Sequence, residues 1–291
     1  FAHAGDLSVL RWHVGGRRGL QTLGVGLWAL GLGLWALTMR QPDPPIFPRI
    51  TIVGLGLVGG SIAFGARRAW PLTHVTGIDR ESVVREALSR RAIDAAADDL
   101  ASVADADLIV LAAPVRQNIA LLRGVAAHAS PSSVITDVGG TKRTIVAAAA
   151  TLSEPVTFVG GHPLGGGARG GFEFATASLF ARRPWILTPH DQAGADAVDR
   201  LSAFVTGLGA YPTVMEAAEH DRLMALISHL PQLATTALME VVGAAADSDG
   251  LRMAGQGLVD TTRLASSPAD VWRDICVTNA DEIREALDLL I

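Results

Sequence analysis

The feature that most constrains this chain is a glycine-rich turn that directly follows a short apolar run. Residues 50–53 (Ile-Thr-Ile-Val) have the composition of a buried parallel strand. Gly54, Gly56 and Gly59 follow with the spacing G-x-G-x-x-G. The first glycine permits a tight turn, the second lets a pyrophosphate approach the backbone, and the third allows the next helix to pack closely. The pattern predicts a strand, a phosphate-binding turn and a helix whose first amides face an anion.

A second strand, predicted over residues 74–78, ends at Asp79, 20 residues after Gly59. A carboxylate at this position accepts hydrogen bonds from the adenosine ribose and repels a 2′-phosphate, so it favours NAD over NADP. Arg80 follows directly and offers a cation to such a phosphate, and a solvated helix cap is the alternative role for Asp79. The residues predicted to bind the cofactor are Gly54, Leu55, Gly56, Leu57, Val58, Gly59, Asp79, Arg80, Ala113 and Pro114.

Further apolar runs alternate with helical stretches, which is the pattern of a doubly wound parallel sheet. The predicted strands cover residues 108–112, 133–136 and 157–159, and the predicted helices cover 118–128 and 144–152. From Glu216 to Asp247 the pattern is helical, with Pro231 expected to kink or break the helix. The sequence therefore predicts an α/β Rossmann-type nucleotide-binding domain followed by a helical segment.

The first 45 residues differ from the rest. Residues 19–39 carry no charged side chain and are just long enough to span a bilayer, which needs about 20 apolar residues. A membrane anchor is one interpretation, and an extension that is not part of the working enzyme is the other. Residues 41–45 (Gln-Pro-Asp-Pro-Pro) are predicted to form a linker, since their prolines disfavour both helix and strand.

The amino-acid composition excludes several classes of binding partner. With 49% hydrophobic and 18% charged residues, the 291-residue chain can bury a full core. A net charge of -5 and the lack of a Lys or Arg run give no reason to expect nucleic acid as a partner. The single cysteine, Cys276, excludes an internal disulfide and a thiolate metal cluster, so no metal is expected. This cysteine usage fits a cytoplasmic location.

His162 is the candidate catalytic group. It lies in the run Gly-Gly-His-Pro at the end of a predicted strand, where ligands of such sheets bind. A neutral imidazole accepts a proton near pH 7, as oxidation of an alcohol requires when hydride leaves. The alternative is a histidine that only hydrogen-bonds loop backbone. Lys142 and Arg143, which begin a predicted helix, either orient a substrate or lie on a solvated face.

These residues occur within an ordered set of motifs that resembles the prephenate and arogenate dehydrogenases of tyrosine biosynthesis. The resemblance runs from about Arg49 to the C-terminus. The motifs cover residues 53–61 (VGLGLVGGS), 137–142 (DVGGTK), 160–164 (GGHPL), 228–231 (SHLP), 260–265 (DTTRLA) and 272–275 (WRDI). The resemblance implies that hydride leaves the ring carbon bearing the hydroxyl while the ring carboxylate departs as carbon dioxide. It also implies an all-helical C-terminal domain through which the protein forms a homodimer.

The same resemblance implies roles for individual residues. His162 would bond the ring hydroxyl and accept its proton, Arg263 would hold a substrate carboxylate with its two-pronged guanidinium, and His229 would face the substrate from the helical domain. Lys142 and Arg169 complete the predicted substrate contacts.

Two positions depart from the family pattern. Gly140 stands where the family often has a serine that supports the catalytic histidine, so Thr141 is the candidate substitute in a catalytic role. Ala168 stands where a glutamate is usual, which weakens any ionic or gating role there. Arg169, in contrast, matches the basic residue that commonly follows.

The expected domains are an extension over residues 1–45, a dinucleotide-binding domain over 46–215 and a helical substrate-binding and dimerisation domain over 216–291. The expected function is oxidation of prephenate to 4-hydroxyphenylpyruvate with NAD. Arogenate, which would give tyrosine, and an amino analogue of prephenate are alternative substrates. A β-hydroxyacid dehydrogenase that depends on Lys142, and a non-catalytic NAD-binding protein, are the competing hypotheses. Membrane contact is expected only if residues 19–39 are an anchor.

Overall fold

The computed structural model of the protein describes residues 44–152, 156–166, 169–190 and 193–291. The apolar segment 19–39 and Ala168 lie outside these ranges, so the predictions made for them are not addressed. Within the described ranges, no helix is both long enough and apolar enough to cross a membrane.

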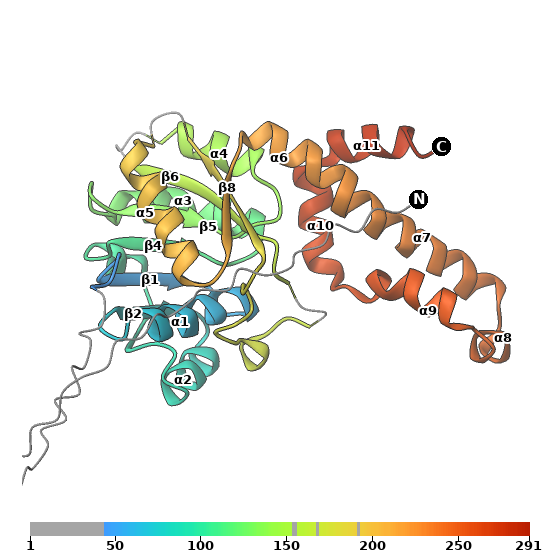
Figure 1. Cartoon of the computed structure of the whole chain (residues 1–291), viewed down its shortest axis with the longest axis horizontal. Helices are drawn as coiled ribbons and strands as arrows, with labels where there is room; N and C mark the ends of the chain where they lie inside the picture. Colours follow the sequence, from blue (N-terminus) through green and yellow to red (C-terminus); the bar gives the residue numbers. More distant parts are fainter. Residues whose placement is uncertain (1–43, 153–155, 167–168, 191–192) are drawn as a thin grey trace, which may run out of the picture. The chain divides into compact units, whose positions relative to one another are not determined.

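Eight strands form one sheet in the order β3-β2-β1-β4-β5-β6-β7-β8 (Figure 1). All neighbours from β3 to β6 are parallel, as in a Rossmann-type fold. The strands are β1 (Arg49–Val53), β2 (His74–Ile78), β3 (Ala95–Ala97), β4 (Leu108–Leu111), β5 (Val134–Asp137), β6 (Thr157–Pro163), β7 (Pro184–Pro189) and β8 (Tyr211–Val214). The predicted strands are all present, and the short alanine strand β3 was not predicted.

The sheet is not parallel throughout, because β7 runs antiparallel to β6. A parallel neighbour requires a crossover connection that returns the chain to the opposite end of the sheet. The described part of the β6–β7 connection holds only a short 3₁₀ turn, η2 (Phe172–Phe174), and this turn packs on α1. The chain therefore re-enters the sheet at the end where β6 left it.

Helices cover both faces of the sheet. Alternating strand residues point to opposite sides: Ile52 packs in one core cluster with Ile62 of α1 and Phe204 of α5, whereas Ile109 packs in a second cluster with Leu122 of α3. The covering elements are α1 (Leu57–Ala69), α2 (Glu81–Ser89), η1 (Leu100–Val103), α3 (Val115–His128), α4 (Arg143–Ala150) and α5 (Ala195–Gly207).

The rest of the chain is helical, which confirms the predicted fold class. Its elements are α6 (Ala217–Met224), η3 (Ala225–His229), α7 (Leu230–Ala245), α8 (Ser248–Arg252), α9 (Gln256–Thr262), η4 (Arg263–Ser266), α10 (Ala269–Thr278) and α11 (Ala280–Asp288). Pro231 does not end the helix here, because η3 is a π-helical turn. A wider turn before a proline gives its ring room against the preceding carbonyls, so α6 continues into α7 (Figure 1).

Polar contacts attach the helical segments to the end of the sheet where β5 stops. The Arg143 guanidinium, at the start of α4, pairs with Asp281 at 2.5 Å and with Glu282 at 3.3 Å. The hydroxyl oxygens of Thr141 and Thr278 lie 2.7 Å apart. These contacts bring the ends of β5 and β6 beside α6, α10 and α11, where the candidate site lies.

Candidate active site

The glycine turn has the geometry that its sequence predicts. Gly54 has a φ of +98°, and a Cβ there would lie 2.7 Å from the carbonyl carbon of Ala112. A Cβ on Gly59 would lie 1.9 Å from the carbonyl oxygen of Gly54, so α1 packs against the turn more closely than any side chain permits. A Cβ on Gly56 would meet no protein atom within 4 Å. The space above Gly56 is therefore open to a ligand.

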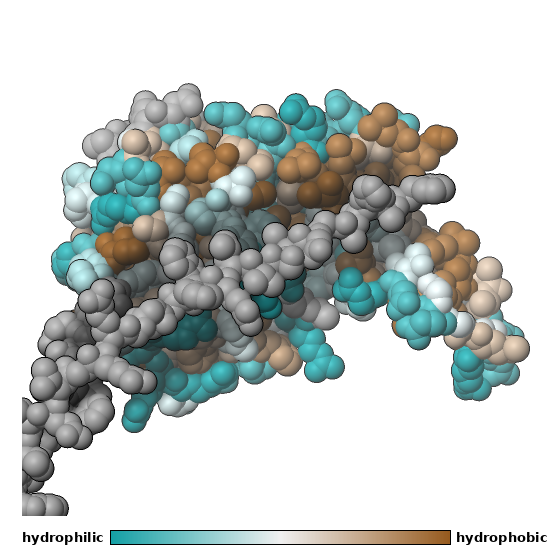
Figure 2. Space-filling model, in the orientation of Figure 1, coloured by the Kyte–Doolittle hydropathy of each residue, from teal (hydrophilic) through white to brown (hydrophobic). Residues whose placement is uncertain are grey.

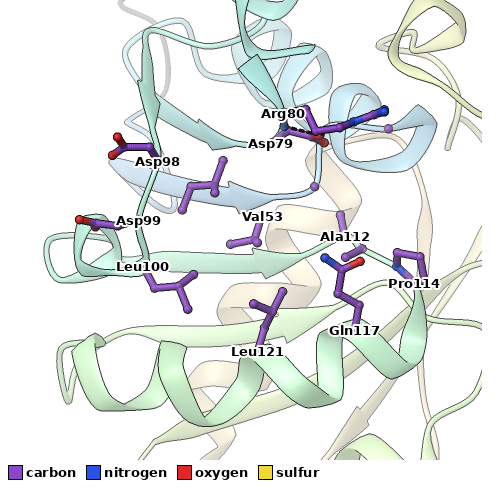
Figure 3. Close-up of a pocket in the computed structure, with 14 residues that line it drawn as sticks. Val53, Asp79, Arg80, Asp98, Asp99, Leu100, Ala112, Pro114, Gln117 and Leu121 are labelled. Carbon is purple, nitrogen blue, oxygen red and sulfur yellow. Dashed lines mark hydrogen bonds and ion pairs between the residues drawn. The ribbon is translucent and has the colours of Figure 1, made fainter. Parts of the chain in front are cut away.

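A cavity of about 590 Å³ lies beside this turn. Figure 3 shows Asp79 and Arg80 together at one end of the cavity, with Leu100 and Leu121 on another side. The Asp79 carboxylate accepts hydrogen bonds from the backbone amides of Leu55 and Arg80, each at 2.6 Å. It thus braces the glycine turn and does not act only as a solvated cap. The glycine cradle, the carboxylate and the apolar wall fit an adenine dinucleotide.

The structure places the predicted cofactor residues in three groups. The side chain of Leu55 is fully buried in the core, and its amide donates to Asp79. Leu57, Val58 and Gly59 form the first turn of α1. The predicted residues that line the cavity are Gly54, Gly56, Asp79, Arg80, Ala113 and Pro114.

His162 belongs to a chain of hydrogen bonds that joins the two halves of the protein. Its Nδ1 lies 2.8 Å from Nε2 of His220, on α6, and Nδ1 of His220 lies 2.8 Å from Oδ1 of Asp221. The Asp221 carboxylate also accepts the backbone amides of Lys142 at 2.7 Å and Arg143 at 3.0 Å. These amides begin α4, where the helix dipole favours a negative charge. His220 and Asp221 are both fully buried.

This chain fixes the protonation pattern of His162. Asp221 accepts a proton from His220 Nδ1, which leaves Nε2 of the neutral His220 as an acceptor. His162 Nδ1 must then carry the hydrogen, so His162 Nε2 holds the free lone pair. A Cβ built on Gly140 would lie 3.9 Å from this Nε2 and 3.4 Å from Ile275. Because glycine stands at position 140, no serine hydroxyl lies beside His162 Nε2 there.

Burial and nearby titratable groups keep His162 unprotonated. The pKa of His162 is well below its usual 6.5, first because burial disfavours the charged form and then because of His220, Lys142 and His229. Burial also lowers the pKa of His220, while its hydrogen bond to Asp221 opposes this shift. The imidazole is therefore neutral at pH 7 and able to accept a proton.

Lys142 lies beneath this group and is fully buried. Its ammonium pairs with the buried carboxylate of Asp137 and donates to the carbonyl of Gly161 at 2.8 Å. Asp137 in turn accepts the amides of Gly139 at 2.8 Å and Gly161 at 3.1 Å. Burial lowers the pKa of Lys142, although Asp137 opposes this. Lys142 thus clamps the ends of β5 and β6 together, with its ammonium bonded to protein groups.

Other predicted residues take different positions. Thr141 bonds to Thr278 and not to His162, because its side chain turns toward α10. His229 is buried, with Nδ1 3.3 Å from Nδ2 of Asn279, and burial lowers its pKa to about 4. Arg263 and Arg169 are both exposed. Neither guanidinium has a hydrogen bond or ion pair among the described residues, so both are available to an anion.

Three buried residues of the site were missed by sequence reasoning: His220, Asp221 and Asn279. The Nδ2 of Asn279 donates to the carbonyl of Asp221 at 2.8 Å, so α10 and α11 meet α6 at the site. The adjacent His-Asp pair in the first helix after the last strand was the available signal. Asn279 gave no signal, because only the folded helices bring it to Asp221.

A polar contact positions the turn that carries Arg263. The buried Gln232, on α7, donates to the carbonyl of Leu264 at 2.8 Å and accepts the hydroxyl of Ser267 at 3.1 Å. Both partners follow Arg263 in the chain: Leu264 lies within η4, and Ser267 comes just after it. Gln232 therefore fixes η4 against α7.

A Rossmann-type sheet, a glycine turn open to a dinucleotide and an oriented neutral histidine define the class of nucleotide-dependent dehydrogenases. Two family models match the chain. The nucleotide-binding domain of prephenate dehydrogenase matches residues 62–214, and the dimerization domain of prephenate dehydrogenase matches residues 216–291. The chain belongs to the prephenate dehydrogenase family.

Named relatives agree with this assignment. A prephenate dehydrogenase of Bacillus subtilis is 35% identical over 82% of this chain, which spans 66% of that protein, just under two thirds. The A. aeolicus prephenate dehydrogenase, solved with hydroxyphenyl propionate and NAD+, is 28% identical with a TM-score of 0.77, over 83% of this chain and 86% of that one. The Synechocystis arogenate dehydrogenase is 30% identical with a TM-score of 0.72, over 82% and 87%.

Two glycine substitutions separate the structural and ligand-facing roles of the turn. Gly59→Ala places its Cβ against Gly54, and we expect the free energy of unfolding to fall by about 1–3 kcal/mol. Gly56→Ala has free space, so unfolding should change by less than about 1 kcal/mol while NAD affinity falls roughly tenfold or more. Urea denaturation and calorimetric titration measure the two effects. Equal stability losses in both variants would contradict this division of roles.

His220 is predicted to set both the tautomer and the pKa of His162. Removing it in His220→Ala deletes one cause of the low pKa and admits water, so the His162 pKa should rise toward 6.5. If His162 is the proton acceptor, activity requires its neutral form, hence the acid limb of the kcat/KM profile should move to higher pH, with kcat falling roughly 100-fold. His220→Gln, which keeps an acceptor, should recover part of kcat. NMR titration of the His162 ring is an independent readout; an unmoved limb and ring pKa would refute the role.

Proposed function

We propose that this protein catalyses the oxidative decarboxylation of prephenate to 4-hydroxyphenylpyruvate with NAD, in tyrosine biosynthesis. The observation that carries this proposal is the neutral His162, oriented through His220 and Asp221 at the end of the sheet that holds the glycine turn. Family membership and the NAD+ bound to the A. aeolicus relative support it. NAD supplies the hydride acceptor when it is bound at Gly54, Gly56 and Asp79.

The residues of this chain perform the proton transfer. His162 Nε2 accepts the proton of the ring hydroxyl as hydride leaves the ring carbon that bears it, and it returns the proton to the same oxygen once the ring carboxylate has left as carbon dioxide and the ring is aromatic. The resulting imidazolium donates from Nδ1 to His220, whose own Nδ1–H is held by Asp221. Asp221 is stabilised by the first amides of α4, so the transient positive charge is compensated at a fixed distance. Burial keeps His162 ready to accept a proton before the substrate binds.

We assign substrate anchoring to Arg263 and Arg169, with His229 facing the substrate from the helical part. Both arginines are exposed and have no anionic partner among the described residues, so each can take a carboxylate. Lys142 is reassigned to positioning, because Asp137 and Gly161 already take its ammonium. Arg263 depends on η4, and η4 depends on Gln232.

The proposed organisation is a dinucleotide-binding domain over residues 46–215 and a substrate-binding and dimerisation domain over 216–291. Homodimerisation is supported by the match to a dimerization domain. It is also supported by apolar side chains exposed over α6 and α7, a region that Figure 2 shows as hydrophobic. These exposed residues are Leu223, Leu226, Ile227, Leu238 and Val241. We also propose a cytoplasmic location, in keeping with a biosynthetic enzyme that has one free cysteine.

Arogenate is the second candidate substrate, favoured by the similarity to the Synechocystis arogenate dehydrogenase. A β-hydroxyacid dehydrogenase would need a lysine that reaches its substrate, which the buried Asp137–Lys142 pair disfavours. A protein that only binds NAD would have no use for an oriented, neutral histidine.

The direct test is an assay of the purified protein with prephenate and with arogenate, each with NAD and NADP. We expect prephenate-dependent NADH formation together with carbon dioxide release, and a loss of at least roughly 1,000-fold in kcat in His162→Asn. NAD affinity should be unchanged in this variant. His128→Asn, a substitution of an exposed histidine on α3, is the matched control and should retain full activity. No NADH above background with either substrate would defeat the proposal.

A double-mutant cycle tests the anchoring of the substrate. Arg263→Ala should raise KM for the cyclohexadienyl substrate roughly 100-fold, as expected for loss of a charge-assisted contact. Gln232→Leu should raise the same KM about tenfold with little change in KM for NAD, because it loosens η4. If Gln232 acts through Arg263, the double variant should match Arg263→Ala alone. Additive effects on KM would show that the two residues act independently.

A further inference from the structure

A second cavity, of about 260 Å³, adjoins the dinucleotide cavity. Gly56, Asp79 and Arg80 line both cavities. The remaining wall comes from two segments far apart in sequence: the first turns of α2, with Ser82 and Glu86, and the η2 segment, with Glu173. The second cavity is therefore lined by residues of the β6–β7 connection as well as by residues of the nucleotide-binding turns.

This second cavity is where a 2′-phosphate of the cofactor would lie. Asp79, the residue expected to face the ribose hydroxyls, lines both cavities. Its volume exceeds that of a phosphate group, so size does not exclude one. Arg80 and Ser82 offer a cation and a hydroxyl, which attract a phosphate. The balance of positive and negative side chains that line the second cavity must therefore decide between NAD and NADP.

Three carboxylates line the cavity, but they are not equivalent. Glu86 pairs with Arg90 at 3.4 Å, so its charge is partly compensated. Asp79 is held by the amides of Leu55 and Arg80. Glu173 has no hydrogen bond or ion pair among the described residues, and its negative charge is uncompensated.

The segment that carries Glu173 is fixed in place by three contacts. The Thr176 amide donates to the hydroxyl of Ser61 on α1 at 3.0 Å. The Arg90 guanidinium lies 5.0 Å from the ring centroids of both Phe64 and Phe172, and it donates to the Phe172 carbonyl at 3.3 Å. These contacts hold η2 against α1 and α2, so the backbone at Glu173 has a defined position at the cavity.

We propose that Glu173 is a second determinant of cofactor choice, whose carboxylate repels the 2′-phosphate that Arg80 and Ser82 would otherwise attract. This inference rests on the proposed use of NAD and extends it to a residue 94 positions beyond Asp79 in the chain. Asp79 cannot be tested cleanly, because its substitution also releases the glycine turn. Glu173 can, since its carboxylate bonds to no other described group.

The test compares adenosine 2′,5′-bisphosphate with AMP as probes, using calorimetric titration of the full protein. Glu173→Gln is expected to strengthen binding of the bisphosphate roughly fivefold, the effect of one removed charge near the surface, while AMP changes less than about twofold. Glu173→Lys should give roughly tenfold or more. Both gains should shrink in high salt, because exposed charges are screened.

Glu81→Gln is the matched control. Glu81 lies on α2, carries the same charge as Glu173 and pairs with Arg85 at 3.5 Å, but it does not line the cavity. It should leave the affinities for both probes unchanged. Equal effects of Glu81→Gln and Glu173→Gln, equal gains for both probes, or no binding of AMP to the wild-type protein would each overturn the inference. The probes need no cyclohexadienyl substrate, so a failure of prephenate turnover would leave this result standing.

Discussion

The buried carboxylate of Asp221 is bonded to three groups that come from both halves of the chain. It holds His220 within α6 and accepts the two amides that begin α4, while the carbonyl of the same residue takes Asn279. A buried charge is tolerated only where such partners replace water. If Asp221 is displaced, His220 loses the partner that fixes its tautomer, α4 loses its cap and the helical segments lose one of their attachments. The geometry around His162 therefore depends on this one carboxylate.

Two charged groups act on His162 from opposite sides. Lys142, paired with Asp137, locks the strand ends and disfavours a proton on the imidazole. The His220–Asp221 pair supplies a place for the positive charge once the proton has arrived. Such a base carries no proton at rest and is supported during transfer. This suits the proposed reaction, whose driving force would come from aromatisation. The protein has mainly to position groups and to move one proton.

Local patterns predicted the nucleotide-binding half well, because the glycine spacing, Asp79 and the alternating strands each reflect contacts close in sequence. The same reasoning failed where distant segments meet. Thr141 was expected to support His162, but its hydroxyl bonds to Thr278 on α10, and the pairing of buried Lys142 with Asp137 was not foreseen. Pro231 was expected to disrupt a helix that a π turn preserves. The antiparallel direction of strand β7 had no signature, since it follows from how the β6–β7 connection folds.

The hydrogen-bond chain of His162 ends on α6, so nucleotide binding and proton transfer depend on different parts of the protein. The cavity for the dinucleotide is built wholly from residues before α4, whereas the protonation pattern of His162 is set by a helix from the other half. A fragment with the sheet alone could retain nucleotide recognition yet hold an imidazole with no preferred tautomer. If the helical half were exchanged between relatives, the groups that set the protonation pattern of His162 would be exchanged with it. The proposed substrate contacts of that half would change in the same step.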